Sequence, residues 1–387
     1  MDENKDIIDN SELKGPRPCK DIEVGSTLDL LNLVLRLLNS APGSSPRWPS
    51  MGYDWGHIYN SKNLENIRII SHNGRVVSSV AIYPSLLKTS LGTVSLGGIN
   101  GFVTDPNYRR RGLGEKVLLD AHKKMKQNGH HIALLVTGIF DYYRKYGWDN
   151  AGSVLNFSLD RSNINYLPSE TNITIKENWR DYLPQLFELF KQEPLRSLRN
   201  KDHFNFLLER KLEKIFVGVI NDIPVSYVGI VGTEIKEYAG KEIYVASLLK
   251  DIFIGLDNKG KTSETTWLKS LGTSYTPTTS YLNMNLLTPD ISSGLPKLLQ
   301  TLGFPLTRQY LGVFKIIDPV GLFDALGLKD IEVTKVGSNW NLRKDNQERT
   351  FSEADLLKFI LGPEKKDDAF LNDIFPLKVF QSSPDIV

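Results

Sequence analysis

Apolar positions in the chain follow two periods, and each period predicts a different kind of element. Short β-branched runs at 67–71 and 75–83 flank His72-Asn73-Gly74, which is the pattern of a β-hairpin. Apolar residues recur at helical spacing over 28–38, and again over 114–128 just before Gly129, which predicts two amphipathic helices. Strands and helices therefore alternate, as in a mixed α/β protein.

Extended over the first 160 residues, the pattern predicts a helix, three antiparallel strands, a fourth strand, a loop, a helix, a strand, a short helix and a last strand. The expected ranges are, in order, 28–38, 67–71, 75–83, from 86, 93–104, 114–128, 131–137, 139–146 and 154–159. Residues 1–20 are polar and contain two prolines, so we expect a mobile tail there.

The same order recurs in the second half, which indicates an internal duplication. Its expected elements are helices at 179–191 and 202–211, a hairpin at 215–220 and 225–231, a strand pair within 242–254, a loop at 255–261, a helix at 263–271, a strand at 280–287 and a helix at 295–302. That last helix ends Leu302-Gly303-Phe304, which parallels Tyr146-Gly147-Trp148. From about 305 the pattern differs: strands at 310–317, 331–336 and 339–343 and helices at 319–326 and 352–362 predict a small third domain.

Length and charge limit the kinds of function that remain. With 387 residues, 40% hydrophobic and 24% charged, the chain should fold into several globular domains. A net charge of +2 is too small for a one-sided field toward nucleic acid or an anionic membrane. The single cysteine, Cys19, excludes an internal disulfide and a cysteine-rich zinc site, and fits a reducing compartment. The six histidines show no short metal-binding spacing, and neither a signal peptide nor a membrane span is expected.

The densest chemical signal is the segment Asp105-Pro-Asn-Tyr-Arg-Arg-Arg-Gly-Leu-Gly114. An Arg- and Gly-rich loop at a helix start can direct several backbone N–H groups at one anion, with the helix dipole adding attraction. Side chains at Gly112 or Gly114 would keep a phosphate away from the backbone. The segment therefore predicts a pyrophosphate site, and a solvated basic loop and a nucleic-acid patch are the alternatives.

These residues resemble the GCN5-related N-acetyltransferases (GNAT). The positions that match the family pattern are Val103, Pro106, Arg109, Gly112, Gly114, Tyr143 and Gly147, with Trp148 in place of the usual Phe. Tandem units with a small third domain look like the Eis-type acetyltransferases, whose last domain is similar to sterol carrier protein. The resemblance implies an α/β (α+β) chain with two GNAT-like mixed-sheet units and a small sterol-carrier-like domain, divided as tail 1–20, active unit 21–162, degenerate unit 163–305 and third domain 306–387.

The resemblance also implies roles for individual residues. Acetyl-CoA would be the co-substrate, with its pantetheine arm along Phe102, Val103 and Thr104. Its pyrophosphate would sit at Arg109 and on the amides of Arg110, Arg111, Gly112, Leu113 and Gly114. Gly138 and Ile139 would lie beside the thiol, and Tyr143 would protonate the departing thiolate. The alternative for Tyr143 is a core aromatic, with Tyr142 as the neighbour that might be confused with it. In Eis-type enzymes the C-terminal carboxylate is the general base, here Val387, for which a frayed tail is the alternative.

Two further segments predict other functions. Gly255-Leu-Asp-Asn-Lys-Gly-Lys-Thr262 matches the nucleotide-loop pattern Gly-x4-Gly-Lys-Thr, without a convincing magnesium-binding Asp after a following strand. Trp48, Tyr53, Asp54 and Trp55 form a candidate cation-binding loop.

We therefore expect a cytoplasmic N-acetyltransferase that needs no metal and transfers an acetyl group to a primary amine by direct attack on the thioester. Its partner would be a small-molecule or peptide amine, with no nucleic acid, no membrane and a possible homo-oligomer. The alternatives are a nucleotide-binding protein and a non-catalytic acetyl-CoA-binding protein.

Overall fold

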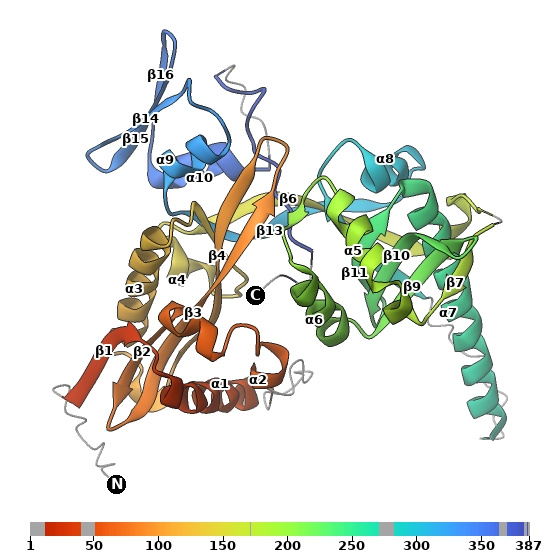
Figure 1. The fold of residues 1–387 in the computed structure, drawn as a ribbon, viewed down its shortest axis with the longest axis horizontal. Helices are drawn as coiled ribbons and strands as arrows, with labels where there is room; N and C mark the ends of the chain where they lie inside the picture. The colour runs from red at the N-terminus through yellow and green to blue at the C-terminus, as the bar shows by residue number, and fades with distance from the viewer. Residues whose placement is uncertain are drawn as a thin grey trace.

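The computed structural model describes residues 12–39, 51–170, 172–270, 282–363, 370–382 and 385. Figure 1 shows two units of similar build side by side, with a smaller third part beside the first. Among the described helices, none combines the length and the apolar character that crossing a bilayer requires.

The first unit follows the predicted order closely. Its elements are β1 Leu13–Pro18, α1 Val24–Asn39, α2 Met51–Asp54, β2 Ile67–His72, β3 Arg75–Lys88, β4 Thr93–Thr104, α3 Leu113–Gln127, β5 Ile132–Leu135, α4 Phe140–Arg144 and β6 Asp149–Asp160. The hairpin turn has Asn73 at φ 48° and Gly74 at φ 76°, the positive angles of a tight type I′ turn. Two expectations are wrong: residues 13–18 form a strand on β2 rather than part of a tail, and Leu86 continues β3 rather than starting another strand.

The second unit repeats this order with one large difference. Its elements are β7 Thr174–Lys176, α5 Leu183–Gln192, β8 Arg196–Ser197, α6 Lys201–Lys211, β9 Lys214–Ile220, β10 Ile223–Val231, β11 Glu234–Gly240, α7 Glu242–Ser270, β12 Asn283–Pro289, α8 Gly294–Thr301 and β13 Leu306–Ile316. The expected strand pair, loop and helix across 242–271 are wrong, because α7 occupies this stretch as one helix. Leu248, Leu249, Ile252 and Phe253 are buried along it, at the spacing of one helical face.

The two units exchange their last strands. The large sheet has the order β1-β2-β3-β4-β5-β13-β6-β12-β11-β10-β9-β7. β6 follows α4 in the first unit but pairs with β12 of the second, whereas β13 follows α8 in the second unit but pairs with β5 of the first. β6 and β13 also pair with each other, antiparallel. The exchange makes one sheet of the two units, and the expected domain boundary at 305/306 falls just before the exchanged strand.

Matching helix ends support the duplication. Gly147 and Gly303 have φ 79° and 78°, the left-handed conformation that ends helices and favours glycine. The Trp148 N–H donates to the Tyr143 carbonyl at 3.4 Å, and the Phe304 N–H donates to the Leu299 carbonyl at 3.0 Å. Leu299 therefore stands at the position in α8 that Tyr143 has in α4.

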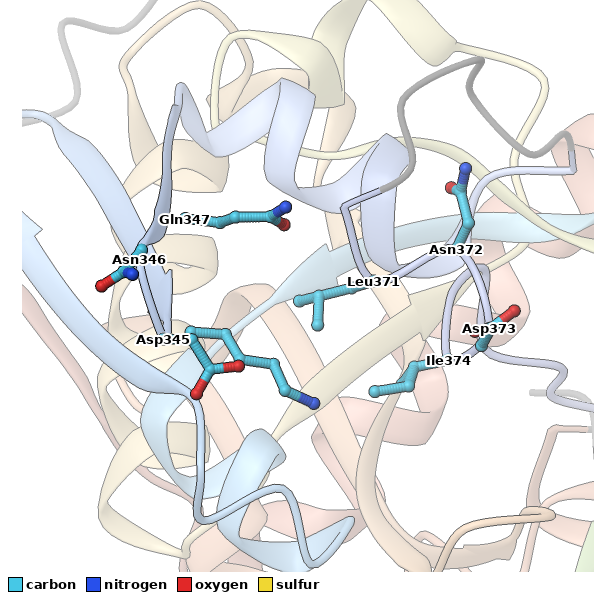
Figure 2. A pocket seen from close by; sticks show the side chains of 8 residues that line it. Asp345, Asn346, Gln347, Leu371, Asn372, Asp373 and Ile374 are labelled. Carbon is cyan, nitrogen blue, oxygen red and sulfur yellow. The ribbon is translucent and has the colours of Figure 1, made fainter.

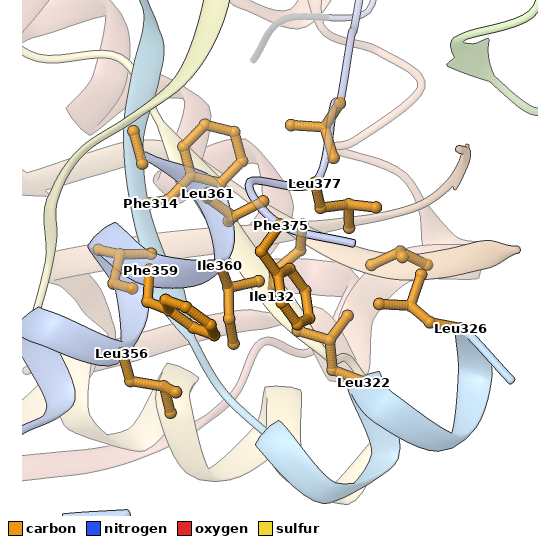
Figure 3. Close-up of a cluster of buried hydrophobic side chains, with 14 of the residues drawn as sticks. Ile132, Phe314, Leu322, Leu326, Leu356, Phe359, Ile360, Leu361, Phe375 and Leu377 are labelled. Carbon is orange, nitrogen blue, oxygen red and sulfur yellow. The ribbon is translucent and has the colours of Figure 1, made fainter. Parts of the chain in front are cut away.

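The third part packs against the first unit's sheet rather than forming a core of its own. It contains α9 Pro319–Ala325, the antiparallel strands β14 Glu332–Val336, β15 Asn339–Lys344 and β16 Gln347–Phe351, and α10 Glu353–Leu361. Figure 3 shows its side chains meeting Ile132 and Phe314 of the large sheet in one buried cluster. The likeness to sterol carrier protein stays a prediction.

The exchanged strand offers a test of the fold. A Cβ on Gly312 of β13 would lie 2.5 Å from Leu134 Cδ1 and 3.1 Å from the Leu135 carbonyl oxygen. Gly312→Ala should therefore lower the free energy of unfolding by about 1–3 kcal/mol, the usual cost of overpacking a core. Gly25→Ala is the matched control, because Gly25 has open space around it and alanine favours a helix by up to about 1 kcal/mol. Urea unfolding measures both; equal loss in the two variants would contradict the packing described here.

Candidate active site

The first unit's sheet opens between β4 and β5. The two strands pair in parallel from Leu96↔Ile132 to Gly98↔Leu134 only, whereas β4 runs on to Thr104 and β5 ends at Leu135. Beyond Gly98, no described strand pairs with β4 on that side. Backbone groups there are available to an extended ligand, because an unpaired strand edge seeks hydrogen-bond partners. Phe102, Val103 and Thr104 lie on this stretch.

A bulge shapes the open stretch of β4. Pairing with β3 steps from Ala81↔Asn100 to Ser79↔Val103, so β4 carries an extra residue there. Gly101 lies in the bulge with φ 57°, and a Cβ on it would come within 1.9 Å of the Tyr59 hydroxyl. That hydroxyl donates to Asn100 Oδ1 at 2.8 Å. Only glycine fits here, and the bulge turns the end of β4.

The loop after β4 is held at its start by a buried carboxylate. Asp105 is 2% exposed, and its Oδ1 accepts the Asn107 N–H at 2.9 Å. The Tyr108 hydroxyl bonds to His72 Nδ1 at 2.9 Å, and the Arg111 guanidinium lies 5.8 Å from the centre of the Tyr108 ring. These contacts tie the loop to β2, so its backbone is held in place before any ligand arrives.

Residues 109–114, which we call the Arg-Gly loop, lead into α3. Arg110 and Gly112 have φ 63° and 73°, and Gly112 is the residue that precedes the helix. Leu113 is 2% exposed and fixes the helix start in the core. The first N–H groups of a helix have no partner inside it, and a backbone that visits the left-handed region near them forms an anion-binding concavity. Arg109 and Arg110 are exposed beside it. The loop therefore has the geometry and charge of a phosphate site.

The predicted cofactor residues and the tyrosine pair come together at Gly114. A Cβ there would lie 3.2 Å from Phe102 Cζ, 3.3 Å from the Tyr142 hydroxyl and 3.5 Å from Thr104 Oγ1. The Tyr143 ring also packs against Phe102, with ring centres 5.8 Å apart, and its centre lies 5.2 Å from that of Tyr142. The open end of β4, the start of α3 and the helix α4 thus converge, and sequence reasoning did not single out Tyr142 as the residue that faces Gly114.

Burial sets the protonation of both tyrosines. Tyr143 is 5% exposed, and burial raises its pKa well above the usual range. Burial also raises the pKa of half-buried Tyr142, with smaller contributions from its tyrosine neighbours. The Tyr143 hydroxyl makes no hydrogen bond to any described protein group. It therefore stays protonated at neutral pH with its hydrogen available to a ligand.

Of the remaining predicted site residues, the structure describes Gly138 and Ile139 but not Val387. Gly138 and Ile139 join β5 to α4, and Ile139 is 61% exposed, as is Val136. Exposed apolar side chains at the mouth of the cleft fit a surface that a ligand covers. Val387 lies outside the described residues, as does Trp48.

The structure contradicts the predicted nucleotide loop and places protein cations at the aromatic loop. Gly255–Thr262 lies within α7, where backbone N–H groups are used in helical hydrogen bonds and cannot cradle a phosphate. Tyr53 and Trp55 already face cations of α6, with Arg210 4.2 Å from the centre of the Tyr53 ring and Lys211 3.2 Å from that of Trp55. Among the described residues, no group of three metal-binding side chains occurs.

A polar group that the sequence pattern did not reveal lies next to β4, level with the point where β4 and β5 separate. Tyr83 in β3 lies opposite Gly98, the last β4 residue paired with β5. His203 of α6 bonds through Nε2 to the Tyr83 hydroxyl at 2.8 Å, and the His57 ring lies edge-on to Tyr83 at 5.1 Å. Burial lowers the pKa of His57 to about 3 and also lowers that of His203. Both imidazoles are therefore neutral, and through His203 the second unit contacts the first unit at Tyr83.

A separate cavity lies in the third part. Figure 2 shows this space of about 420 Å³ between the β15–β16 turn at Asp345–Gln347 and residues 371–374. Its lining belongs to the third part, and it includes none of the residues of the β4–β5 cleft.

Comparison with known proteins agrees with this geometry. Residues 17–151 match a family described as an acetyltransferase (GNAT) domain. Eis1 from Mycobacterium abscessus has a similar fold, with a TM-score of 0.56 and 12% identity over 96% of this chain and 98% of that one. A probable N-acyltransferase from Enterococcus faecalis has a TM-score of 0.60 and 12% identity, over 88% and 85% of the two chains. A GCN5-related N-acetyltransferase from Anabaena variabilis has a TM-score of 0.57 and 14% identity, over 87% and 84%. A search of curated proteins found no match.

The fold and the matched region define the first unit as a GNAT acetyltransferase domain, and the protein is an acyltransferase of the N-acetyltransferase type. The acetyl donor of such a domain is acetyl-CoA. The tandem arrangement of the whole chain resembles that of Eis1, as expected from the sequence.

A half-buried histidine behind the site makes the stability of the fold depend on pH. The Trp148 Nε1–H donates to His122 Nε2 at 3.0 Å, and burial lowers the pKa of His122 to about 3. Between pH 6.5 and 3 the unfolded chain binds a proton that the folded chain does not, so stability falls as pH falls through this window. His122→Gln keeps an acceptor for the indole. As the pH falls, the free energy of unfolding should decrease in both proteins, but in His122→Gln by about 1.4 kcal/mol per pH unit less than in wild type. Urea unfolding at pH 6, 5 and 4 measures this difference. The same pH dependence in both proteins would contradict a neutral His122.

Proposed function

We propose that the protein transfers the acetyl group of acetyl-CoA to a primary amine by direct attack of the amine on the thioester. The observation that carries the proposal is that the open cleft between β4 and β5 leads to the Arg-Gly loop, with Tyr142 and Tyr143 beside the path. One extended ligand with a pyrophosphate at one end and a thioester at the other fits that path.

Binding of the donor follows from the two kinds of surface on the path. The amides of residues 110–114 and the dipole of α3 would hold the pyrophosphate, with Arg109, Arg110 and Arg111 supplying charge. The open edge at Phe102, Val103 and Thr104 would pair with the pantetheine amides, as an added strand does. The acetyl group would then lie near Gly138 and Ile139, where the exposed apolar residues of the cleft mouth gather.

The chemistry needs one proton donor and one proton acceptor. As the amine nitrogen attacks the thioester carbon, a C–N bond forms, the C–S bond breaks, and the thiolate takes a proton. Tyr143 is our choice of donor, because it is protonated and lacks a protein acceptor among the described residues. The amine must shed a proton, and a carboxylate at Val387 would receive it directly or through water.

The acceptor would be a small-molecule or peptide amine. Tyr83, His203 and His57 form its wall on the side of α6, which gives the second unit a part in the site. Neutral imidazoles and phenols accept or donate hydrogen bonds without repelling a cationic substrate. Cytoplasmic location and a homo-oligomer stay predictions.

The donor site is tested by placing a carboxylate in the Arg-Gly loop. Gly112→Asp should abolish acetyl-CoA binding in isothermal titration, because the carboxylate blocks the concavity and repels the pyrophosphate. Gly129→Asp is a closely matched control: both glycines lie at ends of α3, with φ 73° and 71° and open space around them, so backbone strain is similar. Equal acetyl-CoA affinity in the two variants would show that the pyrophosphate does not bind at this loop.

The acid is tested by removing one hydroxyl at a time. Tyr143→Phe keeps the packing and should lower turnover by about 10² to 10⁴, the usual value of a positioned acid, with acetyl-CoA affinity unchanged. Tyr142→Phe is the control on the same helix and should lose less than about tenfold. Steady-state kinetics with a polyamine acceptor measures the turnover of both variants. A reversed order of the two losses would move the role to Tyr142, and full activity in both would exclude this mechanism.

A further inference from the structure

The second unit has its own strand cleft at the place where the first unit has its site. β11 and β12 pair in parallel at Glu234↔Asn285 and Ile235↔Leu286 only, and then separate as β11 runs on to Gly240. By position in the sheet, β11 and β12 correspond to β4 and β5. The duplication thus placed a cofactor cleft in both halves.

This second cleft lacks the means to bind a pyrophosphate. Residues 105–112 separate β4 from α3, whereas Lys241 alone separates β11 from α7. The helix starts with Glu242, whose charge opposes an anion at a helix N-terminus. No Arg-Gly loop can form there.

The chain's C-terminal segment, residues 376–382 with Asp385, reaches the second cleft at Phe380 and Ser382. Phe380 and Ser382 line a space of about 20 Å³ together with Glu237 and Tyr238 of β11 and Leu287 of β12, and the Ser382 hydroxyl donates to Glu237 Oε2 at 2.9 Å. That volume holds about one water molecule. Figure 1 shows the dark blue chain running from the third part into the region between the two units.

A buried ion cluster fastens this segment. Arg199 donates from Nε to Asp385 Oδ1 at 2.9 Å and from Nη2 to Asp385 Oδ2 at 2.5 Å, to Glu237 Oε2 at 2.6 Å and to the Ser382 hydroxyl at 2.7 Å. The Arg199 side chain is 0% exposed, and those of Glu237 and Asp385 are 2% and 1% exposed. The Tyr227 hydroxyl donates to the other oxygen of Glu237 at 2.9 Å. Such clusters fix one arrangement, because any displacement leaves a buried charge without its partner.

The same residues join the second unit to the first. Ser197 and Arg196 pair with Leu87 and Lys88 of β3, and the Leu198 N–H donates to the Leu86 carbonyl at 2.7 Å. Arg199 directly precedes Asn200, the residue that caps α6, and His203 in the first turn of this helix bonds to Tyr83 in the wall of the first cleft. The charge of Asp385 also acts on Tyr83, His57 and His203. The ion cluster therefore places the C-terminal segment beside that wall.

We propose that the second unit's former cofactor cleft is a dock for the chain's own C-terminal segment, and that Arg199 is a positioning residue for acetyl transfer in the first unit. Through Asp385, Ser382 and Glu237 it fixes where the segment meets the acceptor wall at Tyr83 and His203. The kinetic part rests on the proposed function; the dock itself does not.

The test uses the full chain and three variants. Arg199→Met breaks the ion cluster. The triple variant Arg199→Met, Glu237→Leu, Asp385→Leu replaces all three charged side chains of the cluster by apolar ones. Replacing a buried ion cluster in this way often leaves the stability of a protein unchanged. Arg161→Met is the control, because Arg161 also forms a two-oxygen ion pair, with Asp257 of α7, away from the C-terminal segment.

Hydrogen exchange and titration examine the dock. In Arg199→Met and the triple variant, amides of residues 376–385 should exchange at least about tenfold faster, as local opening requires, whereas Arg161→Met should match wild type. Wild type should bind one acetyl-CoA per chain. Unchanged exchange in the triple variant, or two acetyl-CoA per chain in wild type, would overturn the dock.

Kinetics examines the positioning role. The triple variant should keep the thermal midpoint and the acetyl-CoA affinity of wild type while kcat/KM for the amine falls at least about tenfold, since only the segment's placement changes. A folded triple variant with wild-type kcat/KM would exclude a positioning role for Arg199. If wild type transferred no acetyl group to any amine, the proposed function would fail, and the exchange result would still decide the dock.

Discussion

The antiparallel pairing of β6 with β13 is the contact on which the rest of the molecule depends. Each unit gives its last strand to the other. The strand that pairs with β5 of the first unit therefore comes from the second unit, and the strand that pairs with β12 of the second unit comes from the first. Separating the units would expose two strand edges, each a row of unsatisfied backbone groups. The exchange therefore locks β3, α6 and the C-terminal segment into one arrangement, and that arrangement builds the wall beside the cleft.

Within this frame, the two halves have diverged in a physically simple way. One kept a loop of glycines and arginines between strand and helix, together with a tyrosine on the following helix. The other lost the loop, carries Leu299 at the tyrosine's position, and fills its cleft with protein. An unfilled apolar cleft is unfavourable, so losing the ligand makes occupation by the chain itself the stable alternative. A degenerate unit can then serve the active one without chemistry of its own.

Local signals in the sequence predicted much of this structure, and non-local contacts account for most of what they missed. Asn73-Gly74 and the glycines after α4 and α8 require positive φ angles, which short-range sterics determine. The strand pair predicted within 242–254 is wrong: Ile243, Tyr244 and Val245 favour strands locally, whereas packing against β9 and β10 stabilises one helix, α7. No local pattern could place β13 beside β5, or Asp385 on Arg199, 186 positions away. The Arg-Gly loop was predictable because its residues are contiguous.

The strand exchange also bears on how the chain is made. During synthesis the N-terminal end emerges first, yet β5 must wait for its neighbour β13 until residue 316 has left the ribosome. Until then the first sheet ends in an open edge, with Ile132 and Leu134 lacking the cover they have in the finished molecule. Contacts so distant in sequence form slowly. Nascent chains of intermediate length should thus depend on holding chaperones more than the molecule's two-unit appearance implies.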